Sequence, residues 1–246
     1  MYMSNFKTAG IIIIGNEILS GKVHDVNSYY LTSELRSLGV DVRRISVIPD
    51  ETEVIGAEAV KFSETYDHVF TSGGVGPTHD DVTMEGIAKG FGVKLSVHPV
   101  IRDFLIARYQ NNISSPVLKM AEIPEGAEVY LEKGMRFPIV SYKNIFIFPG
   151  IPEYLIDKFS SIKDRFRGSS FYLKRLFLSI YESEFAEILN LVVSANPQVQ
   201  FGSYPIQGNQ EYRVIITAES RLPDQLDAAL NDLMDKLPGN SIVKVE

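Results

Sequence analysis

The chain has 246 residues, of which 45% are hydrophobic and 22% are charged, a balance typical of a soluble globular protein. It contains no cysteine, which excludes disulfides, thiolate catalysis and cysteine-ligated metals. The net charge of −7 argues against a broad nucleic-acid-binding surface. No apolar run approaches the roughly 20 residues that span a bilayer, and the start lacks the features of a signal peptide. We therefore expect a cytoplasmic protein that binds neither nucleic acid nor a membrane.

The first part of the chain alternates between strand and helix patterns. The strand pattern of GIIII, residues 10–14, is apolar on both faces and predicts a buried strand. The patterns that follow in order are a helix at 26–38, a strand at 41–49, a helix at 51–65, a strand at 68–73 and a helix at 84–91. This order predicts an α/β fold with a parallel sheet and helices on both faces. Ligands of such sheets bind at the carboxyl ends of the strands, where the loops 15–27, 49–51 and 72–81 meet.

The second part of the chain is less regular. We expect a helix at 98–110, a loop at 111–127, two strands at 137–142 and 144–150, and a helix at 151–166. The inward residues predicted for this last helix are Leu155, Ile156, Phe159, Ile162 and Phe166. The segment RGSS, residues 167–170, reads as a linker, and a β-α-β-β-α-β pattern follows it. The predicted domains are therefore 1–168 and 169–246, the second being a small α+β domain.

Polar loops after the predicted strands supply the candidate site residues. In GNEILSGKVHDVN, residues 15–27, Glu17 is not required by the turn and is a candidate oxygen ligand. Asn27 is either the cap of the next helix or a ligand to a nucleotide. In VIPDE, Asp50 is either an acid that suits the helix dipole or a functional carboxylate.

The loop TSGGVGPTHDDVT carries the strongest signal. Its candidate residues are Gly73, Gly74, Gly76, Thr78, Asp80 and Asp81. The glycines allow the backbone amides to turn toward an anion at a helix N-terminus. The two aspartates would repel a phosphate there, unless a divalent cation or K⁺ lies between the charges. The alternative is that Thr78 or Asp80 only caps the helix, with Asp81 solvated.

Two further candidates come from later in the chain. In FPGIPE, Gly150 and Pro152 fix a tight path whose amides could line the same pocket, although a plain strand-to-helix joint is the alternative. Lys119 is either a solvated side chain or a phosphate partner, because the predicted loop around it is expected to reach the edge of the site.

These loops resemble the molybdopterin-binding-like (MoaB/Mog) domain, in the branch of the competence/damage-inducible CinA family. The segments that carry the resemblance are GIIIIGNEILSGKVHDVNSYYL, VIPDE, TSGGVGPTHDDVT and FPGIPE. The chain looks closer still to the N-terminal FAD-hydrolase domain of eukaryotic-type FAD synthases, through LRSLGV, FPIVSYKNIFIFPGIPE and the late GSYP. The resemblance implies a three-layer α/β/α sandwich with a mostly parallel sheet, and a small KH-like domain after it. The tail has no clear G-x-x-G loop, so RNA binding is not implied.

The resemblance also implies a function, a nucleotide pyrophosphatase that uses a divalent metal (Co²⁺, Mg²⁺ or Mn²⁺) and K⁺. CinA-like domains cleave ADP-ribose, and the FAD synthase domain is similar to a hydrolase that converts FAD to FMN and AMP. On this basis the three glycines of TSGGVG cradle the diphosphate of a dinucleotide. The carboxylates implied for metal or water are, in order of preference, Asp81, Asp50, Asp80 and Glu17.

Departures from the family pattern leave two alternatives open. Molybdopterin adenylyltransferases have Gly-Gly-Thr-Gly and an arginine before the matching aspartate, whereas this chain has Val75 and Asp80 at those positions. Molybdopterin binding or adenylylation is therefore the second interpretation, and a non-catalytic nucleotide-binding module is the third. Because the sequence ends at Glu246, we expect neither the CinA amidohydrolase reaction nor FAD synthesis. Relatives commonly self-associate, so the resemblance implies a dimer or trimer.

Overall fold

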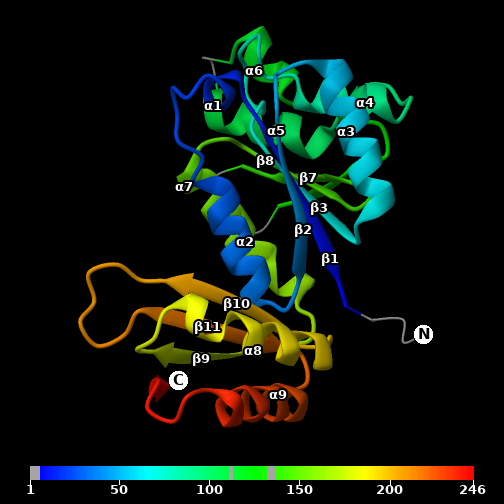
Figure 1. Ribbon diagram of the computed structural model, residues 1–246. Coiled ribbons are helices and arrows are strands. Elements are labelled where there is room, and N and C mark those ends of the chain that lie inside the picture. Colours follow the sequence, from blue (N-terminus) through cyan, green and yellow to red (C-terminus); the bar gives the residue numbers. More distant parts are fainter. Residues whose placement is uncertain (1–5, 111–112, 132–136) are drawn as a thin grey trace. The chain divides into compact units, whose positions relative to one another are not determined.

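The chain divides into two compact units, Met1–Gly168 and Ser169–Glu246. The computed structural model (Figure 1) describes residues 6–110, 113–131 and 137–246. The division falls inside the segment RGSS, from which the sequence predicts the linker.

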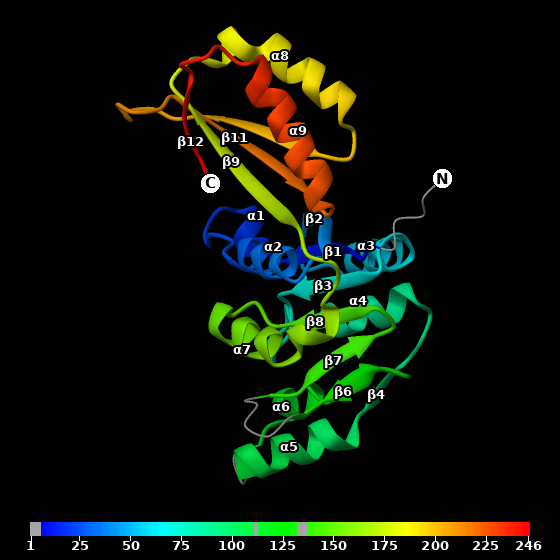
Figure 2. The same cartoon turned by 90° about the horizontal axis from the view of Figure 1, so that it is seen from below.

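The first unit contains a six-stranded sheet in the order β2-β1-β3-β8-β7-β6 and a separate pair of strands, β4 and β5. Its strands are β1 (Thr8–Ile14), β2 (Asp41–Ile48), β3 (His68–Ser72), β4 (Leu95–Val97), β5 (Glu122–Pro124), β6 (Glu128–Tyr130), β7 (Ile139–Tyr142) and β8 (Ile145–Phe148). Its helices are α1 (Asn16–Leu19), α2 (Asn27–Ser37), α3 (Thr52–Thr65), α4 (Thr83–Gly90), α5 (Pro99–Tyr109), α6 (Ser115–Lys119), α7 (Pro152–Ile162) and the 3₁₀ helix η2 (Lys163–Phe166). Strands β2, β1, β3 and β8 run parallel, and β7 and β6 are antiparallel to their neighbours (Figure 2).

Two apolar cores lie on opposite faces of this sheet. Alternate residues of β1 point to opposite faces, so Ile12 and Ile14 pack with α3, α4 and α5, whereas Ile11 and Ile13 pack with α2 and α7. The helices accordingly cover both faces, α2 and α7 on one and α3 and α4 on the other (Figure 1). This arrangement confirms the predicted α/β/α sandwich.

The carboxyl ends of β1, β3 and β8 meet at one edge of the sheet. Ile13 pairs with Ser72, and Ser72 pairs with Phe148, so the loops that follow these strands start side by side. The backbone N–H of Gly73 donates to the carbonyl oxygen of Phe148 at 3.2 Å, which fastens two of the loops together. The edge that the sequence predicts for a ligand therefore exists.

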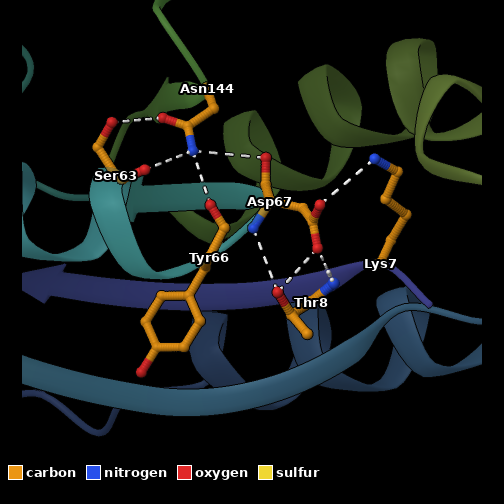
Figure 3. Close-up of polar contacts among 6 residues, drawn as sticks. All are labelled: Lys7, Thr8, Ser63, Tyr66, Asp67 and Asn144. Carbon is orange, nitrogen blue, oxygen red and sulfur yellow. Dashed lines mark hydrogen bonds and ion pairs between the residues drawn. The ribbon is translucent and has the colours of Figure 1, made fainter. Parts of the chain in front are cut away.

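A polar network holds the amino ends of the same strands at the opposite edge (Figure 3). The Nδ2 atom of Asn144 donates to the carbonyl oxygens of Ser63 at 3.0 Å and Tyr66 at 2.8 Å, which lie at the end of α3. The Asp67 carboxylate accepts from the backbone N–H of Thr8 at 2.8 Å, and this bond holds the pKa of Asp67 below its usual value. These bonds join the starts of β1, β3 and β8 and satisfy carbonyl groups that the helix end leaves open.

Parts of the first unit differ from the prediction. The predicted loop at 111–127 is wrong, because its described part contains α6 and β5. The sequence analysis also missed α1, β4 and β6, which have three or four residues each and are too short to show a periodicity. Ile156 does not point inward but is 38% exposed, since it lies beside the stripe of α7 that faces the core.

The second unit has the predicted β-α-β-β-α-β order. Its elements are β9 (Tyr172–Leu178), α8 (Glu182–Ala195), β10 (Gln200–Pro205), β11 (Val214–Ser220), α9 (Pro223–Lys236) and β12 (Ile242–Val245). The strands form an antiparallel sheet in the order β10-β11-β9-β12. Alternate residues of β9 and β11 are buried with residues of α8 and α9, so both helices cover one face of the sheet.

Within the described ranges, no helix combines the length and the apolar character that crossing a membrane requires.

Helices α3 and α4 approach each other at glycines. A Cβ atom on Gly56 of α3 would lie 2.7 Å from the carbonyl oxygen of Gly86 and 2.9 Å from the Cα atom of Gly90, both in α4. Only hydrogen atoms fit between the two backbones here. The loop before α4 carries the candidate site residues, so this contact also positions them.

We expect Gly56→Ala to destabilise the protein although alanine has the higher helix propensity. The propensity gain of about 1 kcal/mol is outweighed by overpacking against α4, which typically costs about 1–3 kcal/mol and here meets backbone atoms. Urea unfolding of Gly56→Ala beside Glu64→Ala, an exposed control in α3, measures the difference. A Gly56→Ala variant as stable as the wild type would show that the helices can separate without cost.

Candidate active site

A cavity of about 920 Å³ opens at the carboxyl ends of the parallel strands. Its volume is near the upper end of the range of roughly 300–1,000 Å³ for small-molecule pockets. The predicted site residues that line it are Glu17, Asp50, Gly73, Gly74, Gly76, Thr78, Asp80, Asp81, Gly150 and Pro152. They come from all four loops that the sequence analysis selects, so the structure brings these loops around one space.

The glycine loop presents backbone N–H groups for which no described residue is an acceptor. Gly73 and Gly74 have φ values of 111° and 60°, and a Cβ atom on Gly73 would collide with the carbonyl oxygen of Ile14. The N–H groups of Gly74, Val75 and Gly76 donate to nothing in the described part of the chain. Successive free amides of this kind form a concavity that binds anions.

The side chain of Asp81 holds this loop through hydrogen bonds to Thr78. Its Oδ2 atom accepts from the backbone N–H of Thr78 at 2.8 Å and from the Thr78 hydroxyl. The same hydroxyl lies 2.7 Å from Oδ1 of Asp80 and lowers the pKa of that carboxyl, which favours its ionised form. Neither Thr78 nor Asp80 caps α4, because its N-cap is Val82 and no side chain bonds there. The capping alternative for this loop is therefore wrong.

Asp50 is half-buried and also serves the loop structure. Its Oδ2 atom accepts from the backbone N–H of Asn16 at 2.8 Å, which ties the end of β2 to the loop after β1. It does not cap α3, whose N-cap is Glu51. Glu17 is exposed in the same loop. One oxygen of Asp50 thus supports the backbone, and no hydrogen bond to the described residues uses the other.

Two of the predicted carboxylates line the cavity with an oxygen that no described residue uses. Among the described residues, no three or more His, Asp or Glu side chains are grouped to hold a metal ion by themselves. Asp50 and Asp81 line one cavity and each commits Oδ2 to a backbone N–H. Magnesium sites in phosphate-binding proteins are built in this way, from one or two carboxylates, phosphate oxygens and water.

Two predicted residues lie outside the cavity. Asn27 is buried, and its Nδ2 atom donates to the carbonyl oxygen of Gly150 at 2.7 Å and to Ser72 Oγ at 2.9 Å. It therefore positions a cavity loop and is not available to a nucleotide. Lys119 lines a smaller neighbouring cavity of about 40 Å³, which shares the glycine loop and Asp81 with the large one.

The sequence analysis missed a polar stripe on α7. Tyr154, Asp157, Lys158 and Ser161 line the cavity, and their spacing of three, four and seven residues puts them on one face of the helix. Arg108 of α5 lines it as well. The spacing was visible in the sequence, but only the apolar stripe of this helix entered the prediction.

Lys158 is the most buried charged side chain of the stripe. Only 7% of its surface is exposed, its Nζ atom donates to the carbonyl oxygen of Pro138 at 2.8 Å, and it lies 4.8 Å from the centre of the Phe137 ring. Burial lowers the pKa of Lys158 to about 7, because the charged form loses its hydration. Near neutral pH the side chain therefore changes charge within the cavity.

We expect Lys158→Met to stabilise the protein most at low pH. An unfolded lysine has a pKa of about 10.4, so the unfolded chain holds more protons than the folded one between pH 7 and pH 10. Stability from this residue then rises with pH across that window. The free energy of unfolding of Lys158→Met, relative to that of the wild type, should fall by about 2–3 kcal/mol between pH 6 and pH 9. Urea unfolding at both pH values measures it, and an advantage that does not vary with pH contradicts the assigned pKa.

Comparisons with known proteins agree with this architecture. Residues 10–167 match the family "Probable molybdopterin binding domain", and residues 170–246 match "FAD synthase, middle domain". The chain is 35% identical over 198 residues to a protein of Archaeoglobus fulgidus, covering 80% of this chain and 86% of that one. It is 30% identical to a probable FAD synthase of Caenorhabditis elegans, covering 98% of this chain and 52% of that protein. A CinA-like protein of Fervidobacterium nodosum is also 30% identical, with 98% and 60% covered.

The chain thus spans about half the length of the FAD synthase relative. Among solved structures, the protein CinA from Thermoplasma acidophilum matches with a TM-score of 0.61 and 31% identity, covering 66% of this chain and 99% of that one. The chain therefore belongs to the molybdopterin-binding-domain family, together with CinA-like proteins and FAD synthases, and carries the FAD synthase middle domain as its second unit.

Proposed function

We propose that the chain is a metal-dependent nucleotide pyrophosphatase, which hydrolyses FAD, ADP-ribose or a related dinucleotide to AMP and a second phosphate product. The observation that carries the proposal is the row of unused amides at Gly74, Val75 and Gly76, in the cavity that Asp50 and Asp81 also line. Amides of this kind suit a diphosphate, and the carboxylates suit the water or metal that attacks or polarises it.

In this proposal the chain's own residues divide the work. The amides of the glycine loop hold the phosphoryl oxygens and stabilise the negative charge that develops on them. The free oxygens of Asp50 and Asp81 hold a divalent cation and orient the attacking water, with Asp80 as a further acid beside them. The cation supplies Lewis-acid polarisation of the phosphoryl group when it is bound.

The names of the relatives support an enzyme that acts on nucleotides, and they do not identify the reaction. The relatives named FAD synthase and CinA-like each match 98% of this chain. The match covers 52% of the FAD synthase relative and 60% of the CinA-like relative. The second candidate is molybdopterin binding or adenylylation, because the first unit matches the molybdopterin-binding family. Asp80 and Val75 line the cavity where adenylyltransferases have an arginine and a threonine, which favours cleavage of a dinucleotide over that chemistry.

The direct experiment measures AMP release. We expect the purified protein to form AMP from FAD or ADP-ribose, with NAD as a further substrate, when Co²⁺, Mg²⁺ or Mn²⁺ and K⁺ are present. Asp81→Asn should lower kcat by about 10²–10⁴-fold, the usual effect of losing an acid–base or metal-binding carboxylate. It keeps an oxygen that accepts from Thr78, so the loop should stay in place.

Asp235→Asn, an exposed change in α9, serves as the control and should leave AMP release unchanged. Tight binding of the dinucleotides without AMP release would refute the hydrolase and favour a binding module. Adenylylation of molybdopterin without dinucleotide cleavage would establish the second candidate instead. Full activity in Asp81→Asn would show that another carboxylate performs the chemistry.

A further inference from the structure

The cavity extends well beyond the glycine loop. The rest of its wall is made by α7, by Arg108 and Tyr109 at the end of α5, and by Met120 and Phe137, and the last two also line the small cavity beside the glycine loop. Gly150, two residues before α7, lies against the glycine loop, since a Cβ atom on it would be 3.4 Å from the Cα of Gly73. Lys158 is six residues past Pro152, which places its Cα about 9 Å further along the axis of α7. A ligand whose diphosphate binds at the glycine loop therefore has room to reach this wall.

Helix α7 has an apolar stripe that packs in the core and a polar stripe that lines the cavity, and Lys158 is the buried member of the polar stripe. Leu155, Phe159 and Ile162 pack in the core on the face of the sheet that α2 also covers. The polar stripe with Lys158 faces the cavity, although the polar face of such a helix usually faces water. A lysine at 7% exposure on a cavity wall costs stability unless its donors are paired, and a ligand in the cavity can pair them.

The hydrogen-bonding capacity of Lys158 is only partly used. An amine carries two N–H donors when neutral and three when protonated. The described part of the chain supplies one acceptor, the carbonyl oxygen of Pro138, and one ring, that of Phe137. The described residues thus leave at least one donor of this buried group unused, and a molecule in the cavity can accept from it.

Aromatic and apolar side chains lie beside this donor, in addition to the polar stripe of α7. The Phe137 ring lies 4.8 Å from Lys158 Nζ and meets Phe104 edge to face, with centroids 5.7 Å apart. Tyr109 and Met120 line the same wall. A flat ring suits such side chains by stacking, and a ring on Phe137 would bring its polar edge to Lys158. A phosphate is instead served by the free amides of the glycine loop.

We propose that Phe137 and Lys158 form a ring-binding subsite, which takes a flat heteroaromatic ring in the half of the substrate beyond the diphosphate. Phe137 stacks on the ring, and Lys158 Nζ donates a hydrogen bond to a ring carbonyl oxygen. Lys158 is then a specificity-determining residue that favours dinucleotides with such a ring over those that end in a bare sugar. The subsite rests on the proposed function, because the diphosphate at the glycine loop sets where the ring falls.

The test compares two probes, FAD, whose second half carries a ring with carbonyl oxygens, and ADP-ribose, whose second half is a sugar. Lys158→Met keeps the length of the side chain and removes the donor. We expect it to lower kcat/KM for FAD about 10–100-fold relative to ADP-ribose, the usual loss for one unpaired buried hydrogen bond. Lys61→Met, an exposed change in α3, should leave the ratio of kcat/KM for FAD to kcat/KM for ADP-ribose unchanged. Phe137→Leu should lower this ratio about 10-fold through lost stacking.

Equilibrium binding separates the subsite from the reaction. Quenching of flavin fluorescence gives the Kd of FAD, and calorimetry gives that of ADP-ribose, both without turnover. If the protein binds FAD but releases no AMP, the hydrolase fails, and a selective loss of FAD binding in Lys158→Met still supports the subsite. Equal losses for both probes would place Lys158 on the shared AMP or diphosphate and overturn the proposal. A Lys158→Met variant whose preference for FAD over ADP-ribose equals that of the wild type would also overturn the subsite. If the protein binds neither probe, both the subsite and the proposed function are overturned.

Discussion

The candidate site depends on the contact between Gly73 and the carbonyl oxygen of Ile14. The backbone of Gly73 has a φ of 111° and lies so close to the end of β1 that no side chain fits between them. The contact sets the loop after β3 against the end of β1, and the Gly73 N–H, which donates to Phe148, adds the loop after β8. The next three amides, those of Gly74, Val75 and Gly76, have no acceptor among the described residues.

The two edges of the main sheet differ in how fully their polar groups are paired. At the amino ends of the strands, Asn144 and Asp67 satisfy the carbonyl and N–H groups around them (Figure 3). At the carboxyl ends, free amides, half-used carboxylates and a buried lysine surround a large cavity. Polar groups that the described residues leave unpaired can be completed by a ligand. Their concentration around the cavity supports a binding site at this edge.

Long, strongly patterned elements were predictable from the sequence, and short or cavity-facing ones were not. Strand β1 contains a continuous apolar run and helix α3 shows helical periodicity over fourteen residues, and the fold class follows from the order of such elements. The glycine loop and Asp50 could be located because strand ends share one edge of a parallel sheet. Lys158 was missed because it sits on the polar side of an amphipathic helix, which a sequence pattern assigns to solvent. Only the three-dimensional arrangement shows that this side faces a cavity.

The central claim is that the free amides of the glycine loop bind the diphosphate of a dinucleotide. Amide ¹H–¹⁵N spectra of the labelled protein, titrated with the non-hydrolysable α,β-methylene analogue of ADP-ribose and Mg²⁺, test it most directly. The account predicts large downfield shifts for the amides of Gly74, Val75 and Gly76, as they gain acceptors, and small shifts for Thr8 and Asp67 at the opposite edge of the sheet. Saturable binding that leaves these three amides unchanged would contradict the account.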